Sequence, residues 1–157
     1  MMIEKIVRDY LEKMSELCNA RTSKFRYSSF EAFVLKNGKE FEISKEKVKT
    51  GKMKECFRNA YHLADNGRKY TYVEGYAITK GLPLPVLHAW CLTEDGKVAD
   101  PTWKDGEEYF GVSFDLNYVR KIILRRKKFG VIDNYEMHFP LLSGEHEDFL
   151  KEISNEK

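Results

Sequence analysis

Residues 86–102 read VLHAWCLTEDGKVADPT, and the rest of the chain can be arranged around this stretch. Its two ends read as strands, and the Glu-Asp-Gly run at 94–96 between them is typical of a tight hairpin turn. The stretch also carries an imidazole, His88, and a carboxylate, Asp100. Together with Cys56 upstream, they form the minimum set for acyl transfer through a thiolate. In that chemistry the thiol attacks, the imidazole carries the proton and the carboxylate orients the imidazole.

The composition predicts one folded domain over residues 1–157, because 42% of the residues are hydrophobic and 13% are aromatic. The 27 basic and 25 acidic residues leave a net charge of +2, which argues against a protein that coats nucleic acid. No apolar run approaches the roughly 20 residues of a membrane span, and the N-terminus lacks the apolar core of a signal peptide. The three cysteines form no Cys-x-x-Cys pair, which favours free thiols in a reducing cytoplasm. We therefore expect a cytoplasmic protein with no membrane contact, no metal and no cofactor.

Helices are expected in four segments, from hydrophobic periodicity and from signals at the helix ends. The segments are residues 3–18, 55–65, 116–128 and 145–153. Cys18 falls on the apolar stripe of the first helix, so we expect it in the core. Asp115 precedes the third helix and can cap it, while the Arg and Lys run at 125–128 lies at the end where the helix dipole favours cations.

Strands are expected where the periodicity changes to two. The segments are residues 70–78, 86–92, 97–100 and 109–114. In the first of them, Tyr70, Tyr72, Glu74 and Tyr76 share one face of the strand. The small residues between them form the other face, on which a helix could pack closely.

The region between the first two helices is expected to begin with a β-hairpin. Residues 27–43 carry spaced aromatic and aliphatic residues around an Asn-Gly turn at 37–38. A lysine-rich link follows at 45–54 and leads into the helix that carries Cys56.

The length of the turn after residue 92 decides whether His88 and Asp100 share a face. A three-residue loop at 94–96, with glycine in the left-handed position, sets His88 opposite Thr102 and puts Asp100 one diagonal step away. Diagonal neighbours lie roughly 7–8 Å apart, within reach of an imidazole and a carboxylate. A two-residue turn would instead send Asp100 to the opposite face. The hypothesis of a shared site therefore predicts the three-residue loop.

Cys56 falls at the start of the predicted helix over 55–65. The N-terminus of a helix and the lysines before it both favour the thiolate form. Taken alone, a helical cysteine is more often a small buried residue, and a lone histidine on a strand is more often part of the core. Cys91 alternates away from His88 along its strand, so we expect it in the core. The functional interpretation rests on the joint order of thiol, imidazole and carboxylate.

These residues also resemble a known family. The HAW motif at 88–90 and the DPT motif at 100–102, with Cys56 upstream at a helix start, resemble the transglutaminase-like branch of the papain-like cysteine enzymes. The resemblance covers residues 50–104, about a third of the chain. The wider pattern, with YVEGY at 72–76 and YFGV at 109–112, looks like small phage and bacterial proteins.

The resemblance implies an α+β fold in which an antiparallel sheet packs on a central helix that carries the cysteine. The expected core is about residues 50–114, with flanking helices at both ends. The resemblance also implies roles: Cys56 as nucleophile, His88 as general base and Asp100 as the group that orients the imidazole.

One departure concerns the oxyanion hole. Papain-like proteases place a glutamine before the cysteine, but this chain has no glutamine, and both of its tryptophans follow Cys56. The oxyanion would rest on the Cys56 N–H and a second donor, for which Asn59 and Asn37 are candidates. Tyr72, Glu74, Tyr76, Trp90 and Asn59 are the residues expected to line a substrate cleft, although an aromatic strand face more often packs under a helix.

Two functions follow from the sequence. The first is a cysteine-nucleophile enzyme that hydrolyses or transfers a peptide or a small-molecule amide or ester. The second is a catalytically inactive module that binds a partner protein, a nucleotide-like ligand or a nucleic acid through the tyrosine strand and the basic helix end. The net charge makes nucleic acid the weaker choice of partner, and the sequence carries no signal for the oligomeric state.

Overall fold

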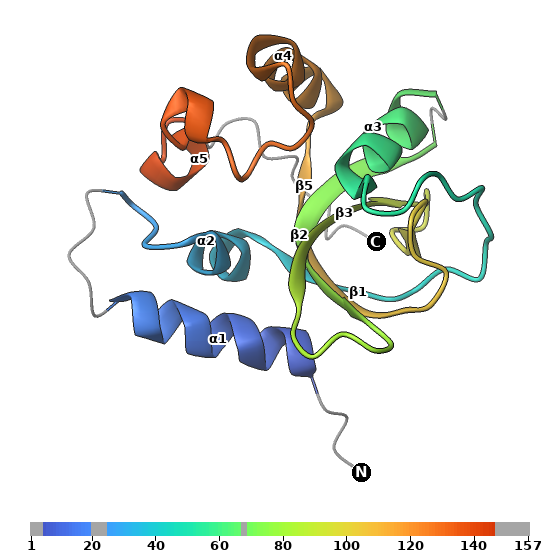
Figure 1. Ribbon diagram of the computed structural model, residues 1–157, viewed down its shortest axis with the longest axis horizontal. Coiled ribbons are helices and arrows are strands. Elements are labelled where there is room, and N and C mark those ends of the chain that lie inside the picture. Colours follow the sequence, from blue (N-terminus) through green and yellow to red (C-terminus); the bar gives the residue numbers. More distant parts are fainter. Residues whose placement is uncertain (1–4, 20–24, 67–68, 147–157) are drawn as a thin grey trace.

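The computed structural model describes residues 5–19, 25–66 and 69–146, and over these the chain is an α+β protein. One curled antiparallel sheet of five strands lies at its centre, in the order β1-β5-β2-β3-β4 (Figure 1). The helical elements are α1 (Ile6–Asn19), α2 (Phe30–Asn37), α3 (Cys56–Asn66), α4 (Leu116–Arg126), the 3-10 helix η1 (Tyr135–Met137) and α5 (Pro140–Ser143). The strands are β1 (Lys39–Phe41), β2 (Thr71–Thr79), β3 (Val86–Leu92), β4 (Val98–Ala99) and β5 (Gly106–Phe114). No helix within the described residues is long and apolar enough to cross a membrane.

The helices build the larger of two cores on one face of the sheet. That face carries Tyr72 and Tyr76 from β2 and Cys91 from β3, and it packs against buried residues from α1 to α5. Glu74 lies among them with no exposed surface. The tyrosine face therefore lies under the helices, and the expectation that a helix would pack on the small-residue face of this strand is wrong.

The other face of the sheet turns inward and forms a second core around Trp90. The curl brings the two edges of the sheet together. Ile43, just after β1, forms a parallel bridge with Val98 of β4, and the Ser44 N–H donates to Val98 O at 2.9 Å. Glycine makes the curl possible: a Cβ on Gly111 would come within 2.7 Å of the Trp90 ring. The small-residue face is thus the inner wall of the curl.

Several predicted elements are confirmed. The expected helices over 3–18, 55–65 and 116–128 correspond to α1, α3 and α4, and the four expected strands correspond to β2, β3, β4 and β5. Asp115 caps α4 through its Oδ1, which accepts from the N–H groups of Asn117 and Tyr118 at 2.7 and 3.2 Å. Cys18 is only partly buried, so its placement in the core was too strong.

The hairpin expected over 27–43 is wrong, because residues 30–37 form α2 and only Lys39–Phe41 are a strand. Ser29 begins the helix by accepting the Ala32 N–H with its Oγ at 3.0 Å, and Gly38 ends it. The helix expected over 145–153 falls largely on residues 147–153, which lie outside the described residues, as do residues 3 and 4 of the first helix.

Candidate functional site

His88 and Asp100 are brought together by the turn between β3 and β4. Cys91 pairs with Ala99 and Leu92 with Val98, and Gly96 has a left-handed φ of 78°. The Thr93 N–H donates to Lys97 O at 2.8 Å, which closes a three-residue loop at 94–96. The predicted loop length is confirmed. His88 Nε2 lies 2.8 Å from Asp100 Oδ2, and the two side chains are 2% and 4% exposed.

Asp100 is held by hydrogen bonds on both of its carboxylate oxygens. Oδ2 accepts from His88 and from the Tyr109 hydroxyl at 2.7 Å. Oδ1 accepts the backbone N–H groups of Thr102 at 2.8 Å and Trp103 at 3.1 Å. A buried carboxylate is costly unless such donors compensate for the lost water. The carboxylate is therefore fixed in one orientation toward the imidazole.

Aromatic rings enclose the imidazole of His88. Trp103 stacks on it, with ring centroids 3.7 Å apart and planes inclined by 13°. Trp90 lies further away at 6.1 Å on the inner face of the sheet and is fully buried. Trp103 and Tyr109 both contact the His88–Asp100 pair, and sequence reasoning missed these contacts.

Cys56 is the first residue of α3 and is partly buried. Its thiol is one of the groups that raise the pKa of the His88 imidazole. Since Nε2 of the imidazole faces Asp100, Nδ1 is the nitrogen available to the sulfur. The structure thus joins His88 to Asp100 by a hydrogen bond and places Cys56 where its thiol affects the pKa of the ring.

Hydrogen bonds on both sides of α3 hold the first turn of the helix in place. On the sheet side, the Cys91 thiol donates to Ala60 O at 3.1 Å. On the loop side, the Asn59 amide donates to Lys52 O and to Thr102 Oγ1, both at 2.9 Å. Cys91 is fully buried, as expected, and burial raises the pKa of its thiol. The position of Cys56 therefore depends on contacts with β3, with the loop before α3 and with the loop after Asp100.

The His88 imidazole is buried and still favours its protonated form. Burial by itself would lower its pKa, but the hydrogen bond to Asp100 and the interactions with Cys56, together with the charge of Asp100, outweigh burial and raise the pKa to about 9. At neutral pH the ring is then an imidazolium ion. A cation in contact with a sulfur atom stabilises the thiolate, which is the nucleophilic form of cysteine.

Tyr72, Glu74 and Tyr76 do not join this site. They lie on the helix-covered face of β2, whereas His88 pairs with Gly75 and shares the opposite, inner face. Glu74 accepts the Tyr72 hydroxyl proton and the backbone N–H groups of residues 131 and 132, at 2.7 and 3.0 Å. These side chains are core residues, and Glu74 anchors the loop after α4. Their expected place in a substrate cleft is therefore corrected.

The two asparagines considered as oxyanion donors have other partners. Asn59 uses its amide group for Lys52 and Thr102, and the Asn37 amide donates to Phe33 O within α2 at 3.0 Å. The first N–H groups of a helix have no acceptor inside the helix. The backbone N–H of Cys56 therefore remains the donor expected at an oxyanion.

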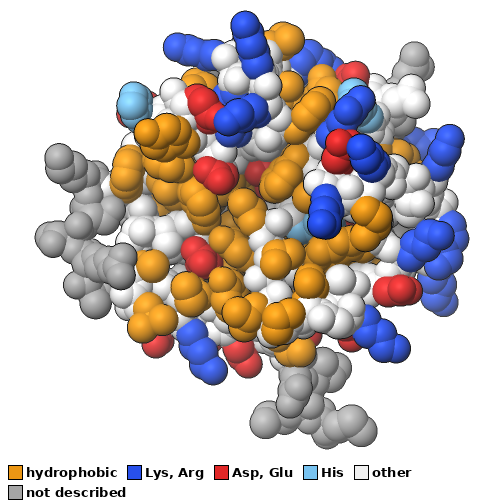
Figure 2. Space-filling view, in the orientation of Figure 1, with side chains coloured by type: hydrophobic (Ala, Val, Ile, Leu, Met, Phe, Trp, Pro, Cys, Tyr) orange, Lys and Arg blue, Asp and Glu red, His pale blue; other side chains and the backbone are white. Residues whose placement is uncertain are grey.

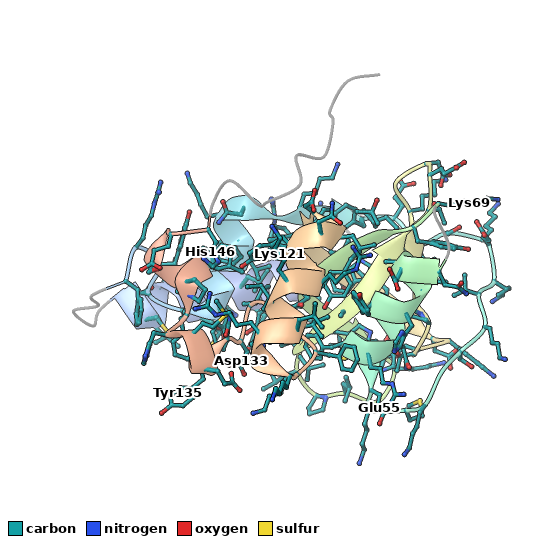
Figure 3. All side chains as sticks on the ribbon, turned by 90° about the horizontal axis from the view of Figure 1, so that it is seen from above. Glu55, Lys69, Lys121, Asp133, Tyr135 and His146 are labelled. Atoms are coloured by element: carbon teal, nitrogen blue, oxygen red, sulfur yellow. The ribbon has the colours of Figure 1, made fainter. Side chains whose placement is uncertain are left out.

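A hollow of about 690 Å³ adjoins the site on the side of Asp100. Asp100, Trp103 and Tyr109 line it, together with residues 43, 44 and 46–50. Glu55 and Lys69, which flank α3 in sequence, lie at opposite ends of this helix (Figure 3). Within the described residues, no group of three or more His, Cys, Asp and Glu side chains is arranged to hold a metal ion.

Comparison with known proteins identifies no relative: no protein-family model, no curated protein and no solved structure matches the chain. The chemistry of the site therefore follows from its own atoms.

Proposed function

We propose that the chain is a cysteine-nucleophile enzyme that hydrolyses or transfers an amide or ester through an acyl-Cys56 intermediate. One observation carries the proposal: a buried imidazole is hydrogen-bonded to a carboxylate that is itself held by other donors, and a thiol at the start of α3 helps to raise the pKa of that imidazole. This is the arrangement that nucleophilic catalysis by cysteine requires. In the same proposal the fold is of the transglutaminase-like, papain-like kind, with α3 as its central helix.

Each step of the proposed reaction uses a group described above. The Cys56 thiolate attacks the carbonyl carbon, and the resulting oxyanion accepts the Cys56 N–H. The His88 imidazolium gives its proton to the leaving amine or alcohol as the carbon–heteroatom bond breaks, which leaves a thioester on Cys56. Neutral His88 then takes a proton from water or an acceptor amine as that molecule attacks the thioester. The acyl product leaves, and the thiolate and imidazolium are restored.

In the proposed resting state the His88 ring carries the proton, and Asp100 stabilises the charge on the ring. The three free cysteines of the described chain suit a reducing compartment, because a reactive thiolate is readily oxidised. We therefore place the proposed enzyme in the cytoplasm.

A catalytically inactive binding module is the second candidate, and the oxyanion site favours it. Loss of one oxyanion donor typically costs about 10²–10³ in rate, and neither asparagine is free to supply the second donor. The surfaces first considered for binding are occupied, however. The tyrosine strand is buried, and Arg126 and Lys128 at the end of α4 pair with Glu136 at 2.9 and 2.8 Å.

Alkylation of the thiols tests the proposal directly. Iodoacetamide should label Cys56 at least about tenfold faster than Cys18 or Cys91 in the native protein, since a thiolate reacts and a thiol does not. The His88→Ala variant should lose most of the excess iodoacetamide rate of Cys56. The Cys18→Ser variant, as the matched control, should label Cys56 at the unchanged rate. The same preparations are then assayed for hydrolysis of a p-nitrophenyl ester, which Cys56→Ala should abolish. A Cys56 that reacts no faster than Cys18, or that ignores the loss of His88, would contradict the proposal.

A further inference from the structure

Five lysines with exposed side chains border the proposed site. They are Lys47, Lys49, Lys52, Lys54 and Lys104, and all five side chains are exposed. We call them the lysine rim. Lys and Arg side chains gather along the right-hand edge of the molecule in Figure 2, where Figure 1 places the loop before α3.

The backbone fixes the lysine rim close to the thiol. The Gly51 N–H donates to Pro101 O at 2.7 Å, and Lys52 O accepts from Asn59 one turn after Cys56. Lys104 directly follows Trp103, whose ring lies against His88. Three rim lysines, at positions 47, 49 and 104, also line the hollow beside Asp100. The positive charges therefore surround the approach to the site.

Within the described residues no carboxylate lies within ion-pair distance of a rim lysine, as is also true of Lys13, Lys36 and Lys121 on the helices; what distinguishes the rim is that its lysines gather beside the site and its hollow. Elsewhere Lys5 pairs with Glu40 at 3.1 Å, Arg120 with Asp65 at 2.6 Å and Lys128 with Glu136 at 2.8 Å. The two glutamates nearest to the rim in sequence have other partners.

The first of these glutamates, Glu46, accepts the Tyr70 hydroxyl at 2.8 Å, and the second, Glu55, lies 3.9 Å from Arg58. Asp105 follows Lys104 and also lines the hollow, so three carboxylates, those of Glu46, Glu55 and Asp105, adjoin five rim lysines, and the excess of positive charge can be neutralised by an approaching molecule. Such a concentration of one sign of charge raises the encounter rate of oppositely charged ligands about tenfold or more at low salt.

We propose that the site acts on acidic peptides, whose carboxylates beside the scissile bond pair with the lysine rim. This inference rests on the proposed acyl-transfer function and names the substrate class of that function. A peptide supplies the acyl group that the thiol needs, whereas the phosphodiester backbone of a nucleic acid has no amide or ester of a carboxylic acid to offer. Val48, Val98 and Trp103 give the adjoining hollow apolar and aromatic walls that suit peptide side chains.

Two alkylating reagents of nearly equal size test the charge preference without any turnover. Iodoacetate is an anion and iodoacetamide is neutral, so the ratio of their rates at one thiol reports the local potential. At low salt we expect the ratio for Cys56 to exceed the ratio for Cys18 in the same sample by about tenfold. Added salt should reduce the difference, because the Debye length shortens to about 3 Å at 1 M.

Charge reversal separates the rim from the net charge of the protein. The triple variant Lys49→Glu, Lys52→Glu, Lys54→Glu should lower the ratio at Cys56 about tenfold, and the ratio cancels any change in the thiolate fraction because both reagents react with the same thiolate. The matched control reverses three exposed lysines on helices away from the site, Lys13, Lys36 and Lys121, and should leave the ratio unchanged. An equal effect of the two triple variants, or no effect of the rim variant, overturns the proposal.

A competition experiment distinguishes an acidic peptide from a nucleic acid as the bound polymer. Poly-glutamate should protect Cys56 from iodoacetamide, and stronger protection by a single-stranded oligonucleotide of equal charge would overturn the choice of peptide. The two proposals fail in different ways. A Cys56 that is no more reactive than Cys18 refutes the acyl-transfer function, whereas a reactive Cys56 that is indifferent to the charge of the reagent refutes only the acidic substrate.

Discussion

At the scale of single residues, His88 combines two properties that usually exclude each other, burial and positive charge. Only 2% of its side chain is exposed, and an isolated cation in that position would lose its proton. Asp100 supplies the compensating charge, and Tyr109 with two backbone N–H groups keeps the carboxylate from turning away. The protonated ring is thus a property of the whole set of contacts around Asp100.

This arrangement predicts that the free energy of unfolding decreases as the pH rises from about 6.5 to about 9. The pKa of His88 goes from 6.5 in the unfolded chain to about 9 in the folded protein. A pKa that is raised on folding adds stability that is fully present below 6.5 and is lost as the pH passes 9. The shift corresponds to about 3 kcal/mol. Urea denaturation at several pH values in this window measures the change.

His88→Gln is the matched variant for this measurement, since it keeps a hydrogen-bonding side chain and removes the titration. Its unfolding free energy should change much less over the same window. Cys56→Ala should reduce the dependence in part, because the thiol contributes to the raised pKa of the ring. An unchanged slope in His88→Gln would show that other groups cause the effect.

The sequence predicted the His88–Asp100 contact but missed the partners that stabilise it. The contact follows from the length of one turn and the alternation of side chains along two strands, which are local properties. Tyr109 comes from β5, which pairs with β1 and β2 and not with β4, and Trp103 comes from an irregular loop. Their approach to Asp100 and His88 depends on the curl of the sheet, for which the sequence has no local signal.

At the scale of elements, the start of α3 is held by hydrogen bonds to the loop before it and to the loop after Asp100. β3 fixes the position of His88, but Cys56 reaches the imidazole only if the first turn of α3 stays in place. The Asn59 amide is the direct link, since it joins the helix to Lys52 and to Thr102. Asn59 is therefore a positioning residue, although the sequence indicated it as a substrate contact.

Asn59→Ala should lower the iodoacetamide rate of Cys56 about tenfold while the chain stays folded. Loss of the amide leaves Lys52 O and Thr102 Oγ1 without their donor, at a cost of about 1–3 kcal/mol. Asn37→Ala is the control, because that amide also donates to a backbone carbonyl but lies on α2. Its stability should fall by a similar or smaller amount without an effect on the thiol. Equal labelling rates in the two variants would mean that Asn59 does not position Cys56.

The error over residues 27–43 is also explained at this scale. Phe33 and Val34 are the fully buried residues of α2. They lie three and four positions after Phe30, which is the spacing of one helix face, whereas Phe33 and Leu35 lie two positions apart, which is the spacing of one strand face. The apolar pattern of this segment therefore fits either structure. The Asn-Gly pair at 37–38 favours a hairpin turn in isolation, but here it ends a helix. Short apolar segments of this kind are decided by what they pack against, and α2 packs on α1 and β5.

At the scale of the whole molecule, the site forms where two layers meet. His88 faces the inner core of the curled sheet, while α3 belongs to the helix layer on the other face. β4 ends at Ala99, and the loop after Asp100 is joined to α3 by the hydrogen bond that the Asn59 amide donates to Thr102 Oγ1 at 2.9 Å. The curl of the sheet therefore controls the geometry of the site from a distance.

Gly111→Ala tests this dependence on the curl. A Cβ at position 111 would lie 2.7 Å from the Trp90 ring and 2.8 Å from Glu74 O, so the sheet would have to open or the tryptophan move. Overpacking of this kind typically costs about 1–3 kcal/mol. Gly81→Ala is the control, because nothing lies within 4 Å of a Cβ there and only its φ of 91° opposes the change. If the curl positions the site, Gly111→Ala should lower both the unfolding free energy and the labelling rate of Cys56. Gly81→Ala should lower only the unfolding free energy. A normal labelling rate of Cys56 in folded Gly111→Ala would show that the site tolerates an altered sheet.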